Sequence, residues 1–146
     1  MRLALRVNAS RYEVEARPDE RLLGVLNRLG LASVRETCGV GVCGACTVLL
    51  DGEPVSGCLL LAPLAEGGEL ETVEGLTEHP VQRAFDEAHA YQCGWCTPGM
   101  ILTAKRLLEE CPHPSEDEIR AGLAGNLCRC GSYVKIIDAV RRASRG

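Results

Sequence analysis

Aromatic residues and lysines are both scarce in this chain. Only 3% of the 146 residues are Phe, Tyr or Trp, so a core must be built mainly from Leu, Val, Ile and Ala. Lys105 and Lys135 are the only lysines, and the net charge of −4 comes without a basic stripe. No nucleic-acid partner is therefore expected, because phosphate binding needs clustered positive charge.

The sequence also lacks a targeting segment and a long apolar run. The stretch MRLALRVNASRYEVEA alternates apolar and polar residues and contains no signal-peptide apolar region. The longest apolar stretch, CLLLAPLA, is too short to cross a bilayer. We therefore expect a cytoplasmic protein without membrane insertion, in a compartment where thiols stay reduced.

Two further absences limit the chemistry of the chain. Asp and Glu are spread along the predicted elements without an inward-facing pair, so no acid–base catalytic residue is predicted. There is no G-x-G-x-x-G motif and no P-loop, so no nucleotide site is predicted. Cysteine, in contrast, occurs nine times. An odd number in a reducing compartment favours metal binding over a disulfide framework.

The apolar pattern predicts strands in the first half of the chain. Residues 2–8 and 11–16 alternate with period two around an Asn-Ala-Ser turn, and CTVLLDGEPVSG places a second hairpin around Asp51-Gly52. PDERLLGVLNRLGL has helical spacing with Asp19 as candidate N-cap, and ELETVEG adds a strand. We expect a small α+β domain over residues 1–74.

The second half has the period of helices. Residues 75–80 are predicted to be a linker, and residues 81–146 contain four amphipathic helices with short joints, which predicts a compact bundle. PSEDEI carries a capping box formed by Ser115 and Glu118. The last helix places Tyr133 on the same apolar stripe as the isoleucines that follow it.

The first cysteine group has the spacing C-x4-C-x2-C plus one cysteine a hairpin later. Its members are Cys38, Cys43, Cys46 and Cys58. This is the plant-type spacing for a [2Fe–2S] cluster. Intervening glycines at 39, 41 and 44 allow positive φ angles that bring backbone N–H groups close to sulfur. Buried or disulfide-bonded cysteines and a structural zinc site are the alternatives, although zinc modules usually pair two separate knuckles.

The second cysteine group combines C-x2-C with C-x-C. Its members are Cys93, Cys96, Cys128 and Cys130. Each pair precedes a predicted helix, with Thr97-Pro98 as N-cap and N1 in one case and Ser132 as N-cap in the other. Positive helix ends favour an anionic centre. Zinc could also take four thiolates, but a plant-type loop in the same chain favours a second [2Fe–2S] cluster.

Nearly the whole chain resembles the small iron–sulfur subunit, or N-terminal domain, of molybdenum hydroxylases. These include xanthine dehydrogenases, aldehyde oxidoreductases and carbon monoxide dehydrogenases. The resemblance rests on ETCGVGVCGACTVLLDGEPVSGCL, TVEGL, HPVQRAF, YQCGWCTPGMILTAKRLL and GNLCRCGSYVKIIDAV. Trp95 stands where phenylalanine is commoner in that family, and CRCGSY replaces the more frequent CRCTGY.

The resemblance implies a fold, cofactors and partners. The fold is a β-grasp, ferredoxin-like domain followed by a four-helix bundle with pseudo-twofold symmetry. The first cysteine group then holds the cluster nearer a flavin partner, and the second holds the one nearer a molybdopterin cofactor, which Gln92 contacts. Substrate is oxidised in a large molybdopterin-binding subunit, and electrons pass through both clusters to FAD in a medium subunit or to another acceptor.

Two other functions remain open from the residues alone. A free-standing two-cluster ferredoxin could serve several enzymes, and a zinc-stapled interaction module would have no redox role. The electron-transfer subunit of a heteromeric complex is the preferred interpretation, because a simple carrier needs no helical half with a pterin-facing glutamine.

Overall fold

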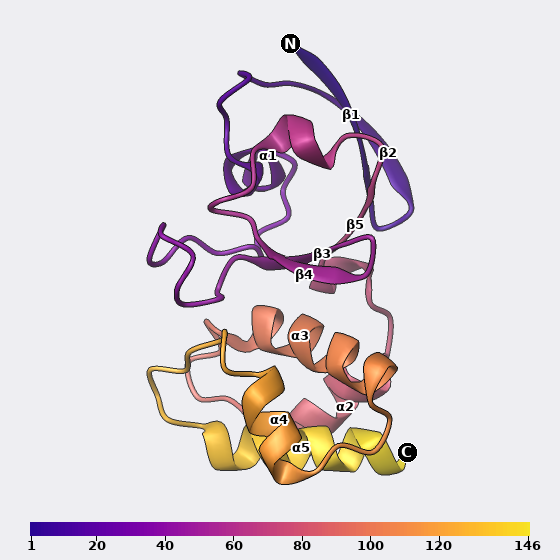
Figure 1. The fold of residues 1–146 in the computed structure, drawn as a ribbon, viewed down its shortest axis with the longest axis vertical. Coiled ribbons are helices and arrows are strands. Elements are labelled where there is room, and N and C mark those ends of the chain that lie inside the picture. Colours follow the sequence, from indigo (N-terminus) through magenta and orange to yellow (C-terminus); the bar gives the residue numbers. More distant parts are fainter.

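The sheet and most of the helices occupy opposite ends of the molecule in the computed structural model, which describes all 146 residues (Figure 1). The strands are β1 (Arg2–Val7), β2 (Ser10–Glu15), β3 (Thr47–Leu50), β4 (Glu53–Ser56) and β5 (Glu69–Glu71). The α-helices are α1 (Leu22–Arg28), α2 (Pro80–Glu87), α3 (Thr97–Glu110), α4 (Glu116–Gly122) and α5 (Tyr133–Arg145). Two short 3-10 helices, η1 (Ala62–Ala65) and η2 (Val73–Gly75), complete the α+β chain.

Two tight hairpins build the sheet, as the alternating pattern predicts. Asn8 and Ala9 have φ angles of 52° and 64° between β1 and β2, and Asp51 and Gly52 have 51° and 83° between β3 and β4. Positive φ at both central residues gives the turn the twist that antiparallel strands need. Strand β5 then pairs parallel with β1 and antiparallel with β3, so the sheet order is β2-β1-β5-β3-β4.

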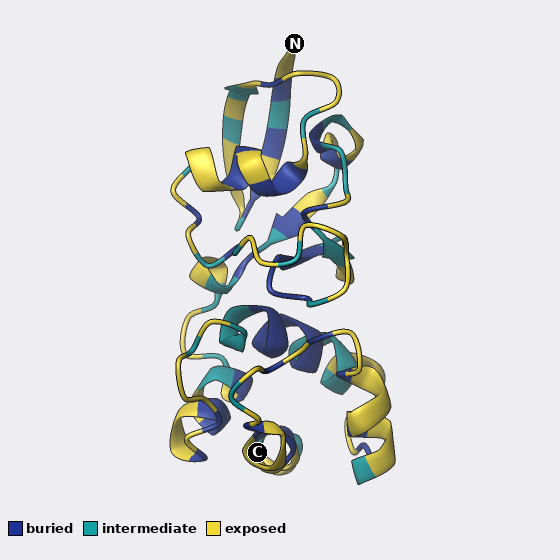
Figure 2. Cartoon of the chain, turned by 90° about the vertical axis from the view of Figure 1, so that its left-hand side faces the viewer, coloured by how far each residue is buried: buried dark blue, intermediate teal, exposed yellow.

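Burial alternates along β1, so every second side chain of this strand belongs to the core of the sheet half. Leu3, Leu5 and Val7 of β1 are fully buried and share one core with buried leucines of α1 such as Leu22. Figure 2 colours the buried stretches of the chain dark blue. Helix α1 begins at Leu22, with Arg21 in extended conformation before it. The prediction of Asp19 as its N-cap is therefore wrong, and Asp19 instead accepts a 3.0 Å hydrogen bond from Arg17.

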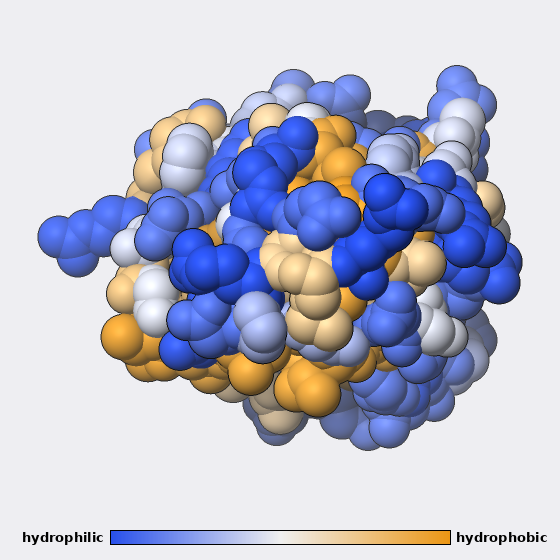
Figure 3. Space-filling view, turned by 90° about the horizontal axis from the view of Figure 1, so that it is seen from above, coloured by the Kyte–Doolittle hydropathy of each residue, from blue (hydrophilic) through white to orange (hydrophobic).

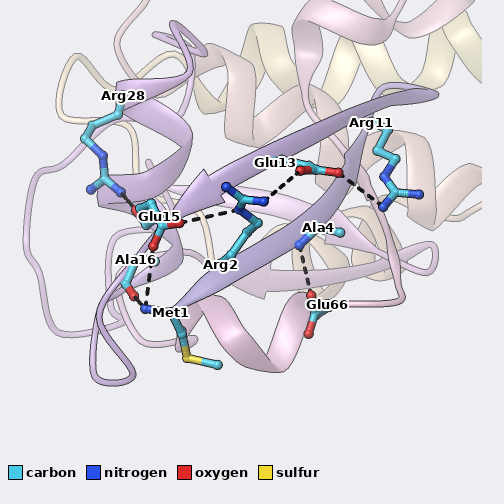
Figure 4. A network of polar contacts seen from close by, with 9 residues as sticks. All are labelled: Met1, Arg2, Ala4, Arg11, Glu13, Glu15, Ala16, Arg28 and Glu66. Atoms are coloured by element: carbon cyan, nitrogen blue, oxygen red, sulfur yellow. Dashed lines mark hydrogen bonds and ion pairs between the residues drawn. The ribbon is translucent and has the colours of Figure 1, made fainter.

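Polar contacts close the outer end of the sheet half (Figure 4). The terminal amino group donates to the Ala16 carbonyl at 2.8 Å, and Glu66 accepts from the Ala4 N–H at 2.9 Å. Because β5 pairs only with the end of β1, the Glu66 carboxylate satisfies an N–H that has no strand partner. The ion pairs of Arg2 with Glu15 and Glu13 are exposed and contribute little to the stability of the fold.

The other four helices share a second core. Phe85, Met100, Ile119 and Ile136 come one from each of α2 to α5 and are all buried there. The capping box at Ser115 is confirmed, since Ser115 accepts from the Glu118 N–H and Glu118 accepts from the Ser115 N–H. Helix α3 has Cys96 as its N-cap residue, so Thr97 already belongs to its first turn, contrary to the prediction.

The two halves are joined along α3, which packs against β3 and β4. Leu49 and Leu102 are almost fully buried but belong to neither core, which places them at this junction. Lys105 of α3 contacts Glu71 at 3.1 Å, and Arg106 contacts Glu53 at 2.5 Å. Apolar packing and ion pairs therefore both fix α3 against the sheet.

The surface is mixed. Figure 3 looks onto the sheet end of the molecule, where hydrophilic residues surround smaller apolar patches. Elsewhere, Val40 and Val42 are 65% and 59% exposed beside the first cysteine group. None of the helices has the length and apolar character required to span a membrane.

Candidate metal centres

The β3–β4 hairpin brings the first cysteine group together. Cys38 and Cys43 lie in the glycine-rich loop before β3, Cys46 directly precedes β3, and Cys58 follows β4. The Cys58 N–H donates to the Cys46 sulfur at 3.4 Å, so the returning strand places these two residues side by side. The thiols meet in two pairs, with Cys43 contacting Cys38 and Cys46 contacting Cys58.

The glycines of this loop aim backbone N–H groups at sulfur, as predicted. Gly39, Gly41 and Gly44 have φ angles of 69°, 76° and 75°. The N–H groups of residues 40, 42 and 43 all lie 3.4–3.5 Å from the Cys38 sulfur. These donors lower the pKa of Cys38 to about 6, whereas burial raises the pKa of Cys46 to about 11. The loop thus stabilises negative charge on the Cys38 sulfur.

The second cysteine group lies where two chain segments enter helices. Cys93 and Cys96 precede α3, and Cys128 and Cys130 precede α5. These thiols also lie in two pairs, with Cys93 beside Cys130 and Cys96 beside Cys128. The pairing joins one cysteine from each segment, so neither segment forms the group alone.

Backbone donors recur in the second group. The Trp95 N–H lies 3.5 Å from the Cys93 sulfur, and the Ser132 N–H lies 3.4 Å from the Cys128 sulfur. The Trp95 N–H lowers the pKa of Cys93. At Cys128, burial raises the pKa, but the Ser132 N–H and the Cys96 thiol lower it by more, so the pKa of Cys128 is also lowered. Burial raises the pKa of Cys96 to about 12. Cys93 and Cys128, the two sulfurs that accept from backbone N–H groups, are therefore the ones whose thiolate form is favoured.

The donor set fits two-iron clusters, and the second group also borders a cavity. A [2Fe–2S] cluster is held by four cysteine thiolates, and each group offers four thiols arranged as two pairs. A cavity of about 450 Å³ opens between the groups, lined by Cys43 of the first and by Cys93, Cys96 and Cys128 of the second. As they stand, no three His, Cys, Asp or Glu side chains are close enough to bind one metal ion.

Tyr133 has a different place from the one that the helical stripe predicts. Its side chain is 39% exposed, and its phenol oxygen accepts a 2.7 Å hydrogen bond from the Cys128 N–H. Tyr133 therefore holds the segment before α5 in position and also lines the cavity beside Cys128. Sequence reasoning missed this role because period alone assigns the residue to the core.

Three other residues near the cysteines in the sequence have different positions relative to the two groups. Cys111 follows the C-terminal end of α3, whereas Cys93 and Cys96 precede its N-terminal end. Gln92 is exposed, and its Nε2 donates to the Cys130 carbonyl at 3.2 Å, which places the side chain beside the second group. Arg129, between Cys128 and Cys130, is exposed.

Comparisons with known proteins cover both halves of the chain. A family model described as "2Fe-2S iron-sulfur cluster binding domain" matches residues 5–77, and one described as "[2Fe-2S] binding domain" matches residues 72–141. The nicotinate dehydrogenase small FeS subunit of Eubacterium barkeri is 47% identical, over 95% of this chain and 92% of its own length. The xanthine dehydrogenase iron-sulfur-binding subunit of Escherichia coli O157:H7 is 43% identical, over 92% and 88%.

Solved structures of related oxidoreductases have the same fold. Quinoline 2-oxidoreductase from Pseudomonas putida 86 superposes with a TM-score of 0.95 at 42% identity, over 99% of this chain and 94% of the matched one. The aldehyde oxidoreductase of Desulfovibrio desulfuricans superposes with a TM-score of 0.93 at 40% identity, over 98% of this chain but only 17% of the matched chain.

Proposed function

Because this chain belongs to the small iron–sulfur subunits of the molybdenum hydroxylase family, we propose that its two cysteine groups hold two [2Fe–2S] clusters that relay electrons. The chain is an electron-transfer subunit of an oxidoreductase complex. The observation that carries the ligand assignment is the gathering of eight cysteines into two groups of four, each with backbone N–H donors aimed at sulfur.

The first cluster is assigned to Cys38, Cys43, Cys46 and Cys58, and the second to Cys93, Cys96, Cys128 and Cys130. Bound [2Fe–2S] clusters supply one-electron oxidation and reduction. The chain's own part is to hold them and to stabilise the added negative charge. Backbone N–H groups of the glycine-rich loop stabilise the negative charge at the first group. The N-terminal ends of α3 and α5 stabilise it at the second.

The domain organisation that we propose follows these two groups. Residues 1–74 form a β-grasp domain with the first cluster, residues 75–80 a linker, and residues 81–146 a four-helix bundle with the second. Two similar helix–cysteine pair–helix segments support the pseudo-twofold relationship within the bundle, because both segments place a cysteine pair before a helix.

The partners are proposed from the family to which the chain belongs, and the position of Gln92 supports one of them. Gln92, exposed and held beside the second group, is assigned to contact the molybdopterin cofactor of a large subunit. The first group, which lies at the opposite side of the relay, is assigned to face an FAD-binding medium subunit. The assembly is proposed to be heteromeric and cytoplasmic, and substrate oxidation takes place in the large subunit.

Replacing one proposed ligand in the assembled complex tests the relay. Cys128→Ser removes a ligand of the second cluster, so turnover with the native electron acceptor should stop while the subunits remain together. Cys111→Ser is the matched control and should leave turnover unchanged, because Cys111 lies at the opposite end of α3 from Cys96. Normal turnover of a fully assembled Cys128→Ser complex would overturn the assignment. A native protein that is monomeric on size exclusion and redox-competent would favour a free-standing carrier.

A further inference from the structure

Arg35 connects the two cysteine-rich segments across the junction between the halves. It lies three residues before Cys38, and its Nη1 donates to the carbonyl oxygens of Gly94 at 2.6 Å and Trp95 at 2.9 Å. Both carbonyls belong to the turn between Cys93 and Cys96. The guanidinium carbon also lies 4.8 Å from the centre of the Trp95 ring, within cation–π distance.

Trp95 forms a second contact with the segment before Cys38. Its indole Nε1 donates to the Thr37 hydroxyl oxygen at 2.7 Å. Arg35, Thr37 and Trp95 therefore form a closed set of contacts, which we call the interdomain clamp. A phenylalanine at position 95 could stack under Arg35 but could not make the bond to Thr37, because it has no N–H group.

The charge of Arg35 has no acidic partner. No carboxylate lies within ion-pair distance of its guanidinium, although most arginines of this chain have one. A partly buried cation that is satisfied only by carbonyl oxygens and an aromatic face attracts nearby negative charge. The sulfurs of Cys93 and Cys96, on either side of those carbonyls, are where the second cluster would carry that charge.

We propose that the interdomain clamp fixes the second cluster relative to the first, and that its unpaired cation favours reduction of the second cluster. This inference rests on the proposed function and makes Arg35 a positioning residue. Loss of the charge should lower the equilibrium constant for reduction of the second cluster. Loss of the Trp95–Thr37 bond should instead change the separation and relative orientation of the clusters.

The test uses the full chain with both clusters, reduced by dithionite and followed by electron paramagnetic resonance. Arg35→Gln should lower the equilibrium constant for reducing the second cluster about threefold to tenfold, and tenfold corresponds to about 59 mV for one electron. Arg35→Lys should restore most of this, because it keeps the charge. Arg11→Gln, which removes an exposed arginine of β2, is the control and should change neither potential.

The second arm measures the magnetic splitting between the two reduced clusters. Trp95→Phe and Thr37→Val should each change it, and the double variant should match either single one, because all three lose the same bond. Wild-type potentials in Arg35→Gln and wild-type splitting in Trp95→Phe, with full iron and sulfide, would overturn the clamp alone. Absence of labile sulfide from the wild-type chain would overturn the proposed function itself.

Discussion

The backbone N–H of Leu127 donates a 2.9 Å hydrogen bond to the carbonyl oxygen of Cys43. This bond joins the two cysteine groups directly, since Cys43 belongs to the first and Leu127 immediately precedes Cys128 of the second. Asn126 adds to it from the buried side: its Nδ2 donates to the Gly44 carbonyl and to the Thr47 hydroxyl, and its Oδ1 accepts from Thr103. These hydrogen bonds hold the two halves together between the two cysteine groups, where electrons would pass.

Asn126 is expected to be essential for this junction. Asn126→Ala removes three buried side-chain hydrogen bonds at the junction and should destabilise the protein by about 1–3 kcal/mol. Asn126→Asp should cost more at neutral pH, about 3–5 kcal/mol, because a buried carboxylate would face two oxygen acceptors. Apparent melting temperatures of the cluster-loaded protein measure both. Asn27→Asp, at an exposed position, is the control, and equal effects at positions 27 and 126 would contradict the account.

Gly44 is expected to tolerate no side chain, for two separable reasons. Its φ is 75°, and an added Cβ would lie 2.4 Å from the Gly125 carbonyl oxygen. Gly30 has a φ of 84° with nothing within 4 Å, so Gly30→Ala should cost only the left-handed strain of about 1–2 kcal/mol. Gly44→Ala should add about 1–3 kcal/mol of overpacking to that. If thermal unfolding showed the same decrease for both variants, the close approach at the junction would be refuted.

His79 is expected to make stability depend on pH. Its Nδ1 accepts from the Val81 N–H at the start of α2, which requires the neutral ring. Burial, followed by repulsion from Lys105, lowers the pKa of His79 below 6.5, although Glu109 and Glu71 oppose the shift.

Because the folded-state pKa is below the unfolded one, this contribution is complete above about pH 6.5 and is lost as the pH falls through the folded value. His79→Asn keeps a side-chain acceptor at the cap and should remove this part of the acid sensitivity. Melting temperatures between pH 7.5 and 5 measure it, with the exposed His113→Asn as control. An unchanged pH profile in His79→Asn would show that the cap does not titrate.

Much of the fold could be predicted from the sequence because it depends on local patterns. The hairpins at Asn8 and Asp51 follow from turn residues between alternating segments, and the cap at Ser115 follows from a glutamate three residues later. The parallel pairing of β5 with β1 could not be predicted in the same way, because it joins residues more than 60 positions apart and leaves no local pattern.

The same distinction holds for the candidate centres. The spacing of Cys38, Cys43 and Cys46 with their glycines indicates a cluster loop without any tertiary information. The contacts of Arg35, Asn126 and Tyr133 around those cysteines depend on how the halves pack, so their residue types alone indicate nothing. From the sequence, Trp95 is only an unusual residue between two cysteines, and its bond to Thr37 supplies the physical role.

Removal of iron and sulfide should unfold much of the helical half. The second group joins the segments before α3 and α5, and its thiols are drawn from both, so loss of the cluster removes a crosslink between them. Far-ultraviolet circular dichroism after acid and chelator treatment should show reduced helix content, which returns on reconstitution with iron and sulfide. Full helix content in the metal-free chain would mean that the helices fold without a cluster.

The most direct test of the central claim is a count of iron, labile sulfide, zinc and molybdenum in untagged protein from its native source, with electron paramagnetic resonance after reduction. The account predicts about four irons and four labile sulfides per chain, two distinct [2Fe–2S] signals, and molybdenum and flavin on co-purifying subunits. Zinc without labile sulfide would contradict it, because the eight paired cysteines would then hold a structural metal and carry no electrons.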